Sequence, residues 1–173
     1  MPSIRPETEA DYAAVDRVIR AAFLARFGSE SEAGLVAALR QTARPYISLV
    51  AEKEGAIIGH IFFSPVTVAS ANETFTAMGL APMAVAPASQ KQGVGSRLVR
   101  AGLAACGRMG YQLVFVLGHA DYYPRLGFVT AETKGFACEY AVPADHFMVA
   151  ELQPGAAAGK SGLVRYMPEF NEL

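Results

Sequence analysis

The chain has 173 residues, a length that suits one domain with a sizeable hydrophobic core. Hydrophobic residues make up 52% and charged residues 18%, a globular composition that excludes an intrinsically disordered chain. The net charge is −1, so no overall positive field attracts nucleic acid or an anionic membrane, and we expect neither as a partner.

Targeting and metal signals are absent from the sequence. The first residues, MPSIRPETEADY, are polar and lack the apolar core of a signal peptide, and the longest apolar runs are strand-sized. Two cysteines are too few for a disulfide framework or a cysteine metal site. The histidines His60, His119 and His146 lack the spacing of metal ligands. We therefore expect a cytoplasmic protein of a reducing compartment with no metal.

The N-terminal part is predicted to form a short strand and two helices. Residues 3–5 have the pattern of a strand. Thr8, followed three residues later by Asp11, is typical of a helix start. Apolar residues then recur at helical spacing until Gly28, and a second amphipathic helix ends before Pro45.

Three strands are expected next. Residues 46–52 and 56–68 form a hairpin around a tight turn at Glu54-Gly55. The third strand lies within residues 74–87 and is interrupted around Gly79–Pro82. A glycine and a proline inside a strand pattern indicate an edge, a bulge or a splay.

The remaining elements complete a single α/β domain over residues 1–173. A helix is predicted at 94–109 and a buried strand within 111–118, so a strand, a crossover helix and a strand form a right-handed unit with parallel strands. Residues 120–128 read as a short helical turn leading to a strand. Another strand lies within 146–152, and the tail contains a loop and a short strand.

The turn between the third of these strands and the following helix reads VAPASQKQGVGSRLV, residues 85–99, and is rich in glycine. It does not fit a Walker loop, because Gly93 and Gly95 are not followed by Lys-Ser or Lys-Thr. It does not fit a dinucleotide fingerprint either. Leu98 occupies the third glycine position, and the strand at 113–117 has no acidic residue.

What remains is Q/R-x-x-G-x-G/A at residues 90–95, which resembles the acetyl-CoA-binding motif of the GNAT N-acetyltransferase superfamily. Three further segments resemble the family in the correct order. LAPMAVAP resembles its splayed fourth strand, and YYPRLGF resembles its Y-x-x-x-G-F element, with Tyr123 on the tyrosine. The segment from FMVAEL to the tail resembles the C-terminal end of the YhbS-like branch.

The resemblance implies the GNAT fold, an α/β fold with a mostly antiparallel central sheet flanked by helices. Its parallel fourth and fifth strands splay apart, and acetyl-CoA inserts into the gap as co-substrate. Free backbone N–H groups at a helix start, together with glycines, suit a pyrophosphate. The residues implied to bind acetyl-CoA are Met83, Ala84, Val85, Gln90, Lys91, Gln92, Gly93, Val94, Gly95 and Ser96.

The resemblance also implies direct acetyl transfer to a primary amine of a small molecule or peptide. Tyr123 takes the role of general acid toward the CoA thiolate, although an isolated tyrosine of this kind is more often a packed aromatic. Tyr122 is the expected packing residue, with an exchange of the two roles left open. A non-catalytic acyl-CoA-binding module and an enzyme for longer acyl groups are the alternatives.

The general base is left open. Family members often place a glutamate on the fourth strand, and this strand has none. His60, Glu73, His119 or an ordered water are the alternatives. Between the first two helices, Glu30 and Glu32 are candidates to attract a cationic amine, although acids at a helix start are commonly just solvated. The acceptor amine and the oligomeric state, including a homodimer, stay open.

Overall fold

The structure is a computed structural model that describes all residues, 1–173. Its helices and strands, joined by short 3-10 turns, are β1 (Ser3–Pro6), α1 (Tyr12–Phe27), α2 (Ser31–Thr42), β2 (Ile47–Lys53), β3 (Ala56–Ala69), β4 (Thr74–Val85), α3 (Val94–Arg108), β5 (Leu113–Leu117), β6 (Phe128–Thr130), β7 (Phe136–Cys138), β8 (Phe147–Glu151) and β9 (Gly162–Arg165). All expected elements are present, and β7 is an additional strand. No helix is long and apolar enough to cross a membrane.

All nine strands belong to one sheet, whose main order is β1-β2-β3-β4-β5-β8-β6. Along this path every pair is antiparallel except β4 and β5, which are parallel, as the sequence predicts. The long strand β3 pairs with β2 along its first part and with β9 at Thr67–Ala69. The short strand β7 pairs with β9 in parallel.

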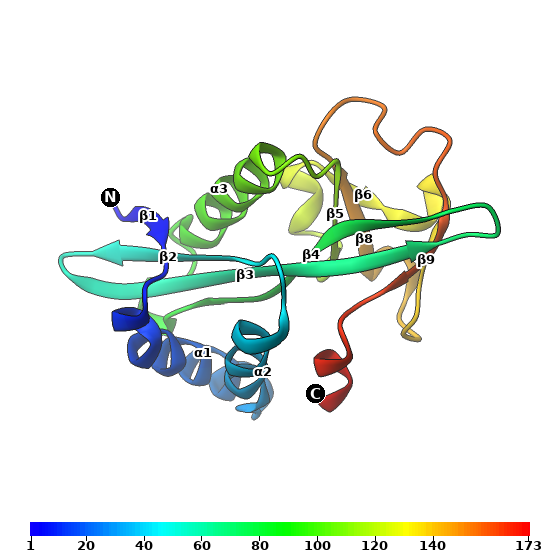
Figure 1. The fold of residues 1–173 in the computed structure, drawn as a ribbon. Coiled ribbons are helices and arrows are strands. Elements are labelled where there is room, and N and C mark those ends of the chain that lie inside the picture. The colour runs from blue at the N-terminus through cyan, green and yellow to red at the C-terminus, as the bar shows by residue number, and fades with distance from the viewer.

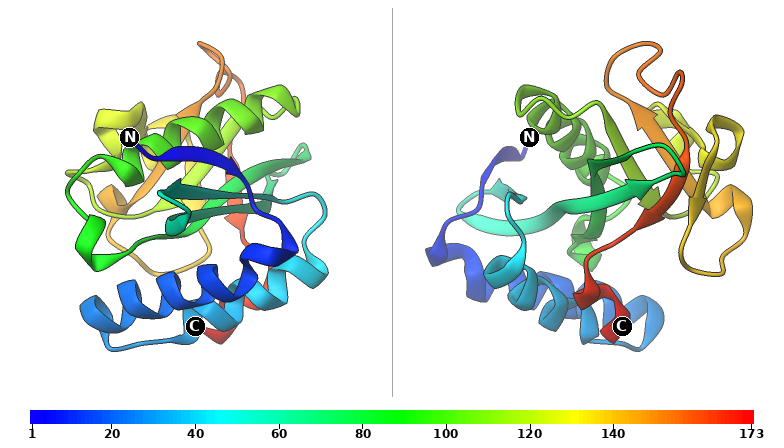
Figure 2. Two further views of the ribbon diagram at one scale, coloured as in Figure 1. Left: turned by 90° about the vertical axis from the view of Figure 1, so that its left-hand side faces the viewer. Right: turned by 45° about the vertical axis from the view of Figure 1, so that its right-hand side comes forward.

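Helices cover both faces of this sheet (Figures 1 and 2). α1 and α2 lie against one face and α3 lies against the other. The two core clusters follow the alternation of side chains along a strand. Phe62 of β3 is fully buried with the α1 and α2 side, whereas its neighbour Phe63 is fully buried with α3. The sheet therefore separates two cores.

The predicted helix start at Thr8, the helix end at Gly28 and the hairpin turn are all present. The backbone N–H of Thr8 donates to the Asp11 carboxylate at 2.8 Å, and α1 ends at Gly28 in the left-handed conformation. The hairpin turn at Glu54-Gly55 has positive φ at both residues, which suits the twist of its two strands.

The interruption predicted around Gly79–Pro82 is a bulge at which β4 leaves β5. On the β3 side, Ile61 pairs with Met83 and Phe63 pairs with Leu80, so β4 has one extra residue in this stretch. On the β5 side, pairing ends at Leu80 with Val116. From Ala81 to Val85 that edge of β4 has no strand beside it, which is the splay that the resemblance implies.

Candidate active site

A cavity of about 910 Å³ lies where β4 and β5 diverge. Its walls come from the end of β4, the first turn of α3, the segment after β5 and the end of α1. All of the residues predicted to bind acetyl-CoA line it except Gln92. The side-chain amide of Gln92 instead donates to the carbonyl of Ala88 at 3.2 Å.

The glycine turn places Gly93 and Gly95, which have no side chains, on the wall of this cavity. Gly93 adopts a φ of +84° just before α3, a left-handed conformation that favours glycine, and a Cβ there would meet nothing within 4 Å. The first N–H groups of a helix have no intrahelical partner and carry partial positive charge. Gln90 closes the turn by donating its amide to the carbonyl of Val85 at 3.0 Å.

Tyr123 lies in the short 3-10 turn Tyr123–Leu126, directly across the splay from β4. Its ring packs over Gly118, where a Cβ would come within 2.3 Å of the ring, and edge-on against Phe128 at 5.4 Å between centroids. Tyr123 is buried, with 8% of the residue exposed. Burial raises the pKa of Tyr123 well above its usual range, so the phenol is protonated at neutral pH.

Tyr122 reaches the glycine turn, a contact that no sequence pattern indicates. Its hydroxyl lies 3.1 Å from the Ser96 hydroxyl in the first turn of α3, and a Cβ on Gly95 would come within 3.0 Å of that same hydroxyl. The Arg125 guanidinium lies 5.3 Å from the centre of the Tyr122 ring. Tyr122 therefore links the segment after β5 to the helix start.

A second cavity, of about 600 Å³, adjoins the first. The two share Phe23, Met83, Leu117 and Tyr123, so they meet at Tyr123. The second cavity is lined mostly by apolar and aromatic side chains from α1, α2, the β4 bulge and the C-terminal segment. The phenol of Tyr123 therefore borders both cavities.

Comparison with known families decides the classification. The family model described as "Acetyltransferase (GNAT) domain" matches residues 3–131. The chain belongs to the GNAT acetyltransferase family. Both the fold and the enzyme class expected from the glycine turn are thereby confirmed.

Relatives of this GNAT protein include two proteins of Escherichia coli K12 named as uncharacterized N-acetyltransferases. YhbS is 36% identical over 171 residues, covering 98% of this chain and 99% of YhbS. YjhQ is 46% identical over 123 residues, covering 69% of this chain and 68% of YjhQ.

Two solved structures support the same classification. The crystal structure of E. coli YhbS in complex with CoA has a TM-score of 0.88 at 35% identity, covering 98% of this chain and 92% of that one. A GNAT acetyltransferase from Brucella melitensis in complex with acetyl-CoA has a TM-score of 0.78 at 34% identity, covering 98% of both chains. The Brucella relative thus holds the acetyl-CoA expected from the sequence, and YhbS holds CoA.

Of the three side chains considered as the base of this GNAT protein, only His119 lines the cavity. It is exposed, and its Nε2 lies 2.6 Å from the Arg26 guanidinium. Glu73 is exposed in the turn between β3 and β4 and lines neither cavity.

His60 belongs to a separate buried cluster on β2, β3 and α2. Its Nε2 lies 2.8 Å from the Ser48 hydroxyl, Ser48 donates to the Glu7 carboxylate, and Arg40 bonds that carboxylate from the other side. His60 is 0% exposed, and burial together with the Arg40 guanidinium lowers its pKa to about 3. The buried imidazole lines neither of the two cavities.

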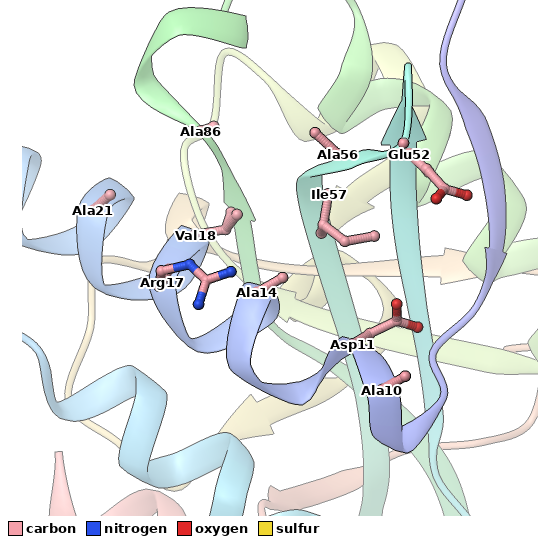
Figure 3. A pocket seen from close by; sticks show the side chains of 11 residues that line it. Ala10, Asp11, Ala14, Arg17, Val18, Ala21, Glu52, Ala56, Ile57 and Ala86 are labelled. Atoms are coloured by element: carbon pink, nitrogen blue, oxygen red, sulfur yellow. The ribbon is translucent and has the colours of Figure 1, made fainter.

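A third pocket, of about 500 Å³, lies between α1 and the β2–β3 hairpin (Figure 3). It contains none of the predicted site residues. Asp11 and Glu52 on its wall are both hydrogen-bonded by Arg5, at 2.9 Å and 3.1 Å. Nowhere in the structure do three or more His, Cys, Asp or Glu side chains form a group that could hold a metal ion.

Proposed function

We propose that the protein transfers the acetyl group of acetyl-CoA directly to a primary amine of a small molecule or peptide. The observation that carries the proposal is the junction of two cavities at Tyr123, one of them bounded by the glycine turn. The bound CoA of YhbS and the bound acetyl-CoA of the Brucella relative support it, since both proteins are about one-third identical to this chain.

The residues around the larger cavity fit acetyl-CoA. The pyrophosphate would lie at Gly93, Val94 and Gly95, where backbone N–H groups and the helix dipole favour an anion. The free edge of β4 at Met83–Val85 offers backbone groups to the amides of the pantetheine arm, as it would to an added strand. Acetyl-CoA, when bound, supplies an activated thioester.

The apolar cavity favours a neutral acceptor amine. Removing an ammonium from water disfavours the charged form and lowers the pKa of the amine. Water or His119 then takes the proton, because His60 and Glu73 do not line the cavities. A backbone N–H of β4 near Met83–Val85 stabilises the developing oxyanion.

Tyr123 acts on the leaving thiolate. Its raised pKa keeps the proton on the phenol at neutral pH. A proton or hydrogen bond is therefore available to the sulfur as the carbon–sulfur bond breaks. The same side chain borders the acceptor cavity, which suits a group at the reacting centre.

A non-catalytic acyl-CoA-binding module is the second candidate function. It is favoured by one observation: no carboxylate of β4, and neither His60 nor Glu73, lines the cavities. The two functions differ in turnover but share cofactor binding, so one assay separates them.

The test is release of free CoA from acetyl-CoA, measured with a panel of polyamines, aminoglycosides, amino acids and peptide N-termini. We expect amine-dependent CoA release together with an acetylated product seen by mass spectrometry. Acetyl-CoA binding without turnover of any amine would favour the binding module. Turnover only with longer acyl-CoA thioesters would favour the other alternative, and no binding of acetyl-CoA would contradict the proposal.

A further inference from the structure

We propose that the acceptor is a primary amine on an apolar body of aromatic size that carries no anionic group. This inference rests on the proposed function and concerns the cavity of about 600 Å³ that meets the cofactor cavity at Tyr123. Pockets of this size bind small molecules through apolar walls and a few polar groups.

The charge in this cavity excludes anionic acceptors. Glu32, in the first turn of α2, is the only charged side chain on the wall, and no lysine, arginine or histidine lines it. A carboxylate or phosphate on the acceptor would be buried without a cation and next to Glu32, which is costly. A cationic amine approaching the cavity meets an attractive charge instead.

The walls suit an aromatic or branched apolar body. Most of the lining is hydrophobic: Phe23, Leu35, Leu80, Ala81, Pro82, Met83, Leu117, Val142 and Phe170. Three tyrosines, Tyr123, Tyr140 and Tyr166, also line it, together with Asn171 and Leu173. Aromatic walls pack well against an apolar ring.

Tyr166 supplies a polar group that has no partner within the chain. Its side chain is 7% exposed, and its hydroxyl is buried without a hydrogen bond. The Tyr166 ring packs over Gly79, where a Cβ would come within 2.8 Å of it. On another side it packs against the Phe170 ring, at 5.2 Å between centroids. A buried hydroxyl without a partner is unfavourable, so a polar atom of the acceptor that bonds it gains affinity.

Matched pairs of compounds test directly whether the cavity excludes anionic acceptors. Phenethylamine, tyramine and tryptamine differ from phenylalanine, tyrosine and tryptophan in lacking only the carboxylate. With acetyl-CoA and wild-type protein, we expect kcat/KM to be at least about a hundredfold higher for each amine than for its amino acid, because the carboxylate would be buried unpaired. Spermidine and kanamycin serve as amines without an apolar body, and we expect both to be poorer acceptors than tryptamine.

Two variants with controls test the residues. Glu32→Gln should raise KM for phenethylamine, whereas Glu30→Gln should not, because Glu30 pairs with Arg20 and does not line the cavity. Tyr166→Phe should raise KM for the best acceptor without lowering the thermal unfolding midpoint, because it removes a hydroxyl that is unsatisfied in the free protein. A merely structural Tyr166 would leave KM unchanged.

The outcomes separate this inference from the proposed function. Preferred turnover of amino acids, spermidine or kanamycin would overturn the inference and leave the acetyltransferase intact. If no amine of the panel turns over, the thermal unfolding midpoint with CoA present decides. A further rise on adding tryptamine supports the pocket assignment, and no rise with any of the three apolar amines overturns it. Failure of acetyl-CoA to bind would contradict the proposed function itself.

Discussion

Tyr122 and Tyr123 are adjacent in the chain, and their rings are nearly perpendicular, at 85°. Tyr123 borders both cavities, whereas the Tyr122 hydroxyl reaches Ser96 at the start of α3. The spacing to Gly127 and Phe128 singles out Tyr123 in the sequence. Nothing local reveals the contact of Tyr122, since it depends on where α3 packs.

Replacing Tyr123 tests its role as the acid. We expect Tyr123→Phe to lower kcat by about a hundredfold or more, the usual contribution of a general acid, with acetyl-CoA affinity retained. Steady-state CoA release gives kcat, and thermal shift with acetyl-CoA reports binding. Tyr111→Phe is the control, because Tyr111 lines neither cavity. An unchanged kcat for Tyr123→Phe would remove Tyr123 from the mechanism.

His60 links stability to pH at the buried cluster. Its pKa of about 3 in the folded protein lies below the ~6.5 of an unfolded chain, so below pH 6.5 the unfolded state binds a proton that the folded state does not. Glu7, 3.9 Å from the imidazole, would favour the charged form, but Arg40 and Ser48 already occupy that carboxylate.

Stability should therefore fall as the pH is lowered from 7 to 5, by up to about 1.4 kcal/mol per pH unit below 6.5 from this group. Urea unfolding at several pH values measures the slope. His60→Gln should flatten it over the same range, since glutamine does not titrate. A variant with the wild-type slope would show that other groups cause the pH dependence.

At the scale of elements, the approach of α3 to the sheet depends on one glycine. A Cβ on Gly102 would come within 2.2 Å of the Phe63 ring, and Phe63 is fully buried. Gly107 of the same helix has open space around its Cβ position. The helix itself is evident from its apolar spacing, but a contact with β3 is visible only once the fold is known.

The two glycines make a matched pair of substitutions. We expect Gly102→Ala to destabilise the protein by about 1–3 kcal/mol, the usual cost of overpacking a core. Gly107→Ala should instead stabilise it by about 0.5–1 kcal/mol, because alanine is the better helix former. Chemical denaturation of both variants measures the two free energies of unfolding. Equal effects of the same sign would contradict the packing described for α3.

The sheet was predictable where local signals are strong and unpredictable where pairing alone makes the strand. Gly79 and Pro82 marked the bulge, and the parallel β4–β5 pair followed from the crossover helix. The three-residue strand β7 was missed because its sequence, FAC, carries no strand pattern of its own. It is a strand only because β9 lies beside it.

At the scale of the whole molecule, the fold brings residues from separate parts of the chain together around the two cavities. The cofactor cavity was largely predictable, because most of its residues lie in one stretch from β4 to α3. The acceptor cavity was not, because it draws on α1, α2, β4, β5 and the C-terminal segment. Glu32, Met83 and Tyr123 of its wall carry a signal in the sequence, whereas Tyr166 carries none.

Calorimetric titration of acetyl-CoA into three proteins tests the central claim, that the glycine turn holds the pyrophosphate. Gly93 and Gly110 have similar left-handed conformations, with φ of +84° and +90°, at opposite ends of α3, and both have open space around them. Aspartate therefore meets similar backbone strain at either position, but only Gly93→Asp brings a carboxylate to the cavity.

Wild type and Gly110→Asp should bind acetyl-CoA alike. Gly93→Asp should weaken binding by at least about a hundredfold, since juxtaposed like charges cost several kcal/mol. Wild-type protein that fails to bind acetyl-CoA, or Gly93→Asp protein that binds it as tightly as wild type, would contradict the account.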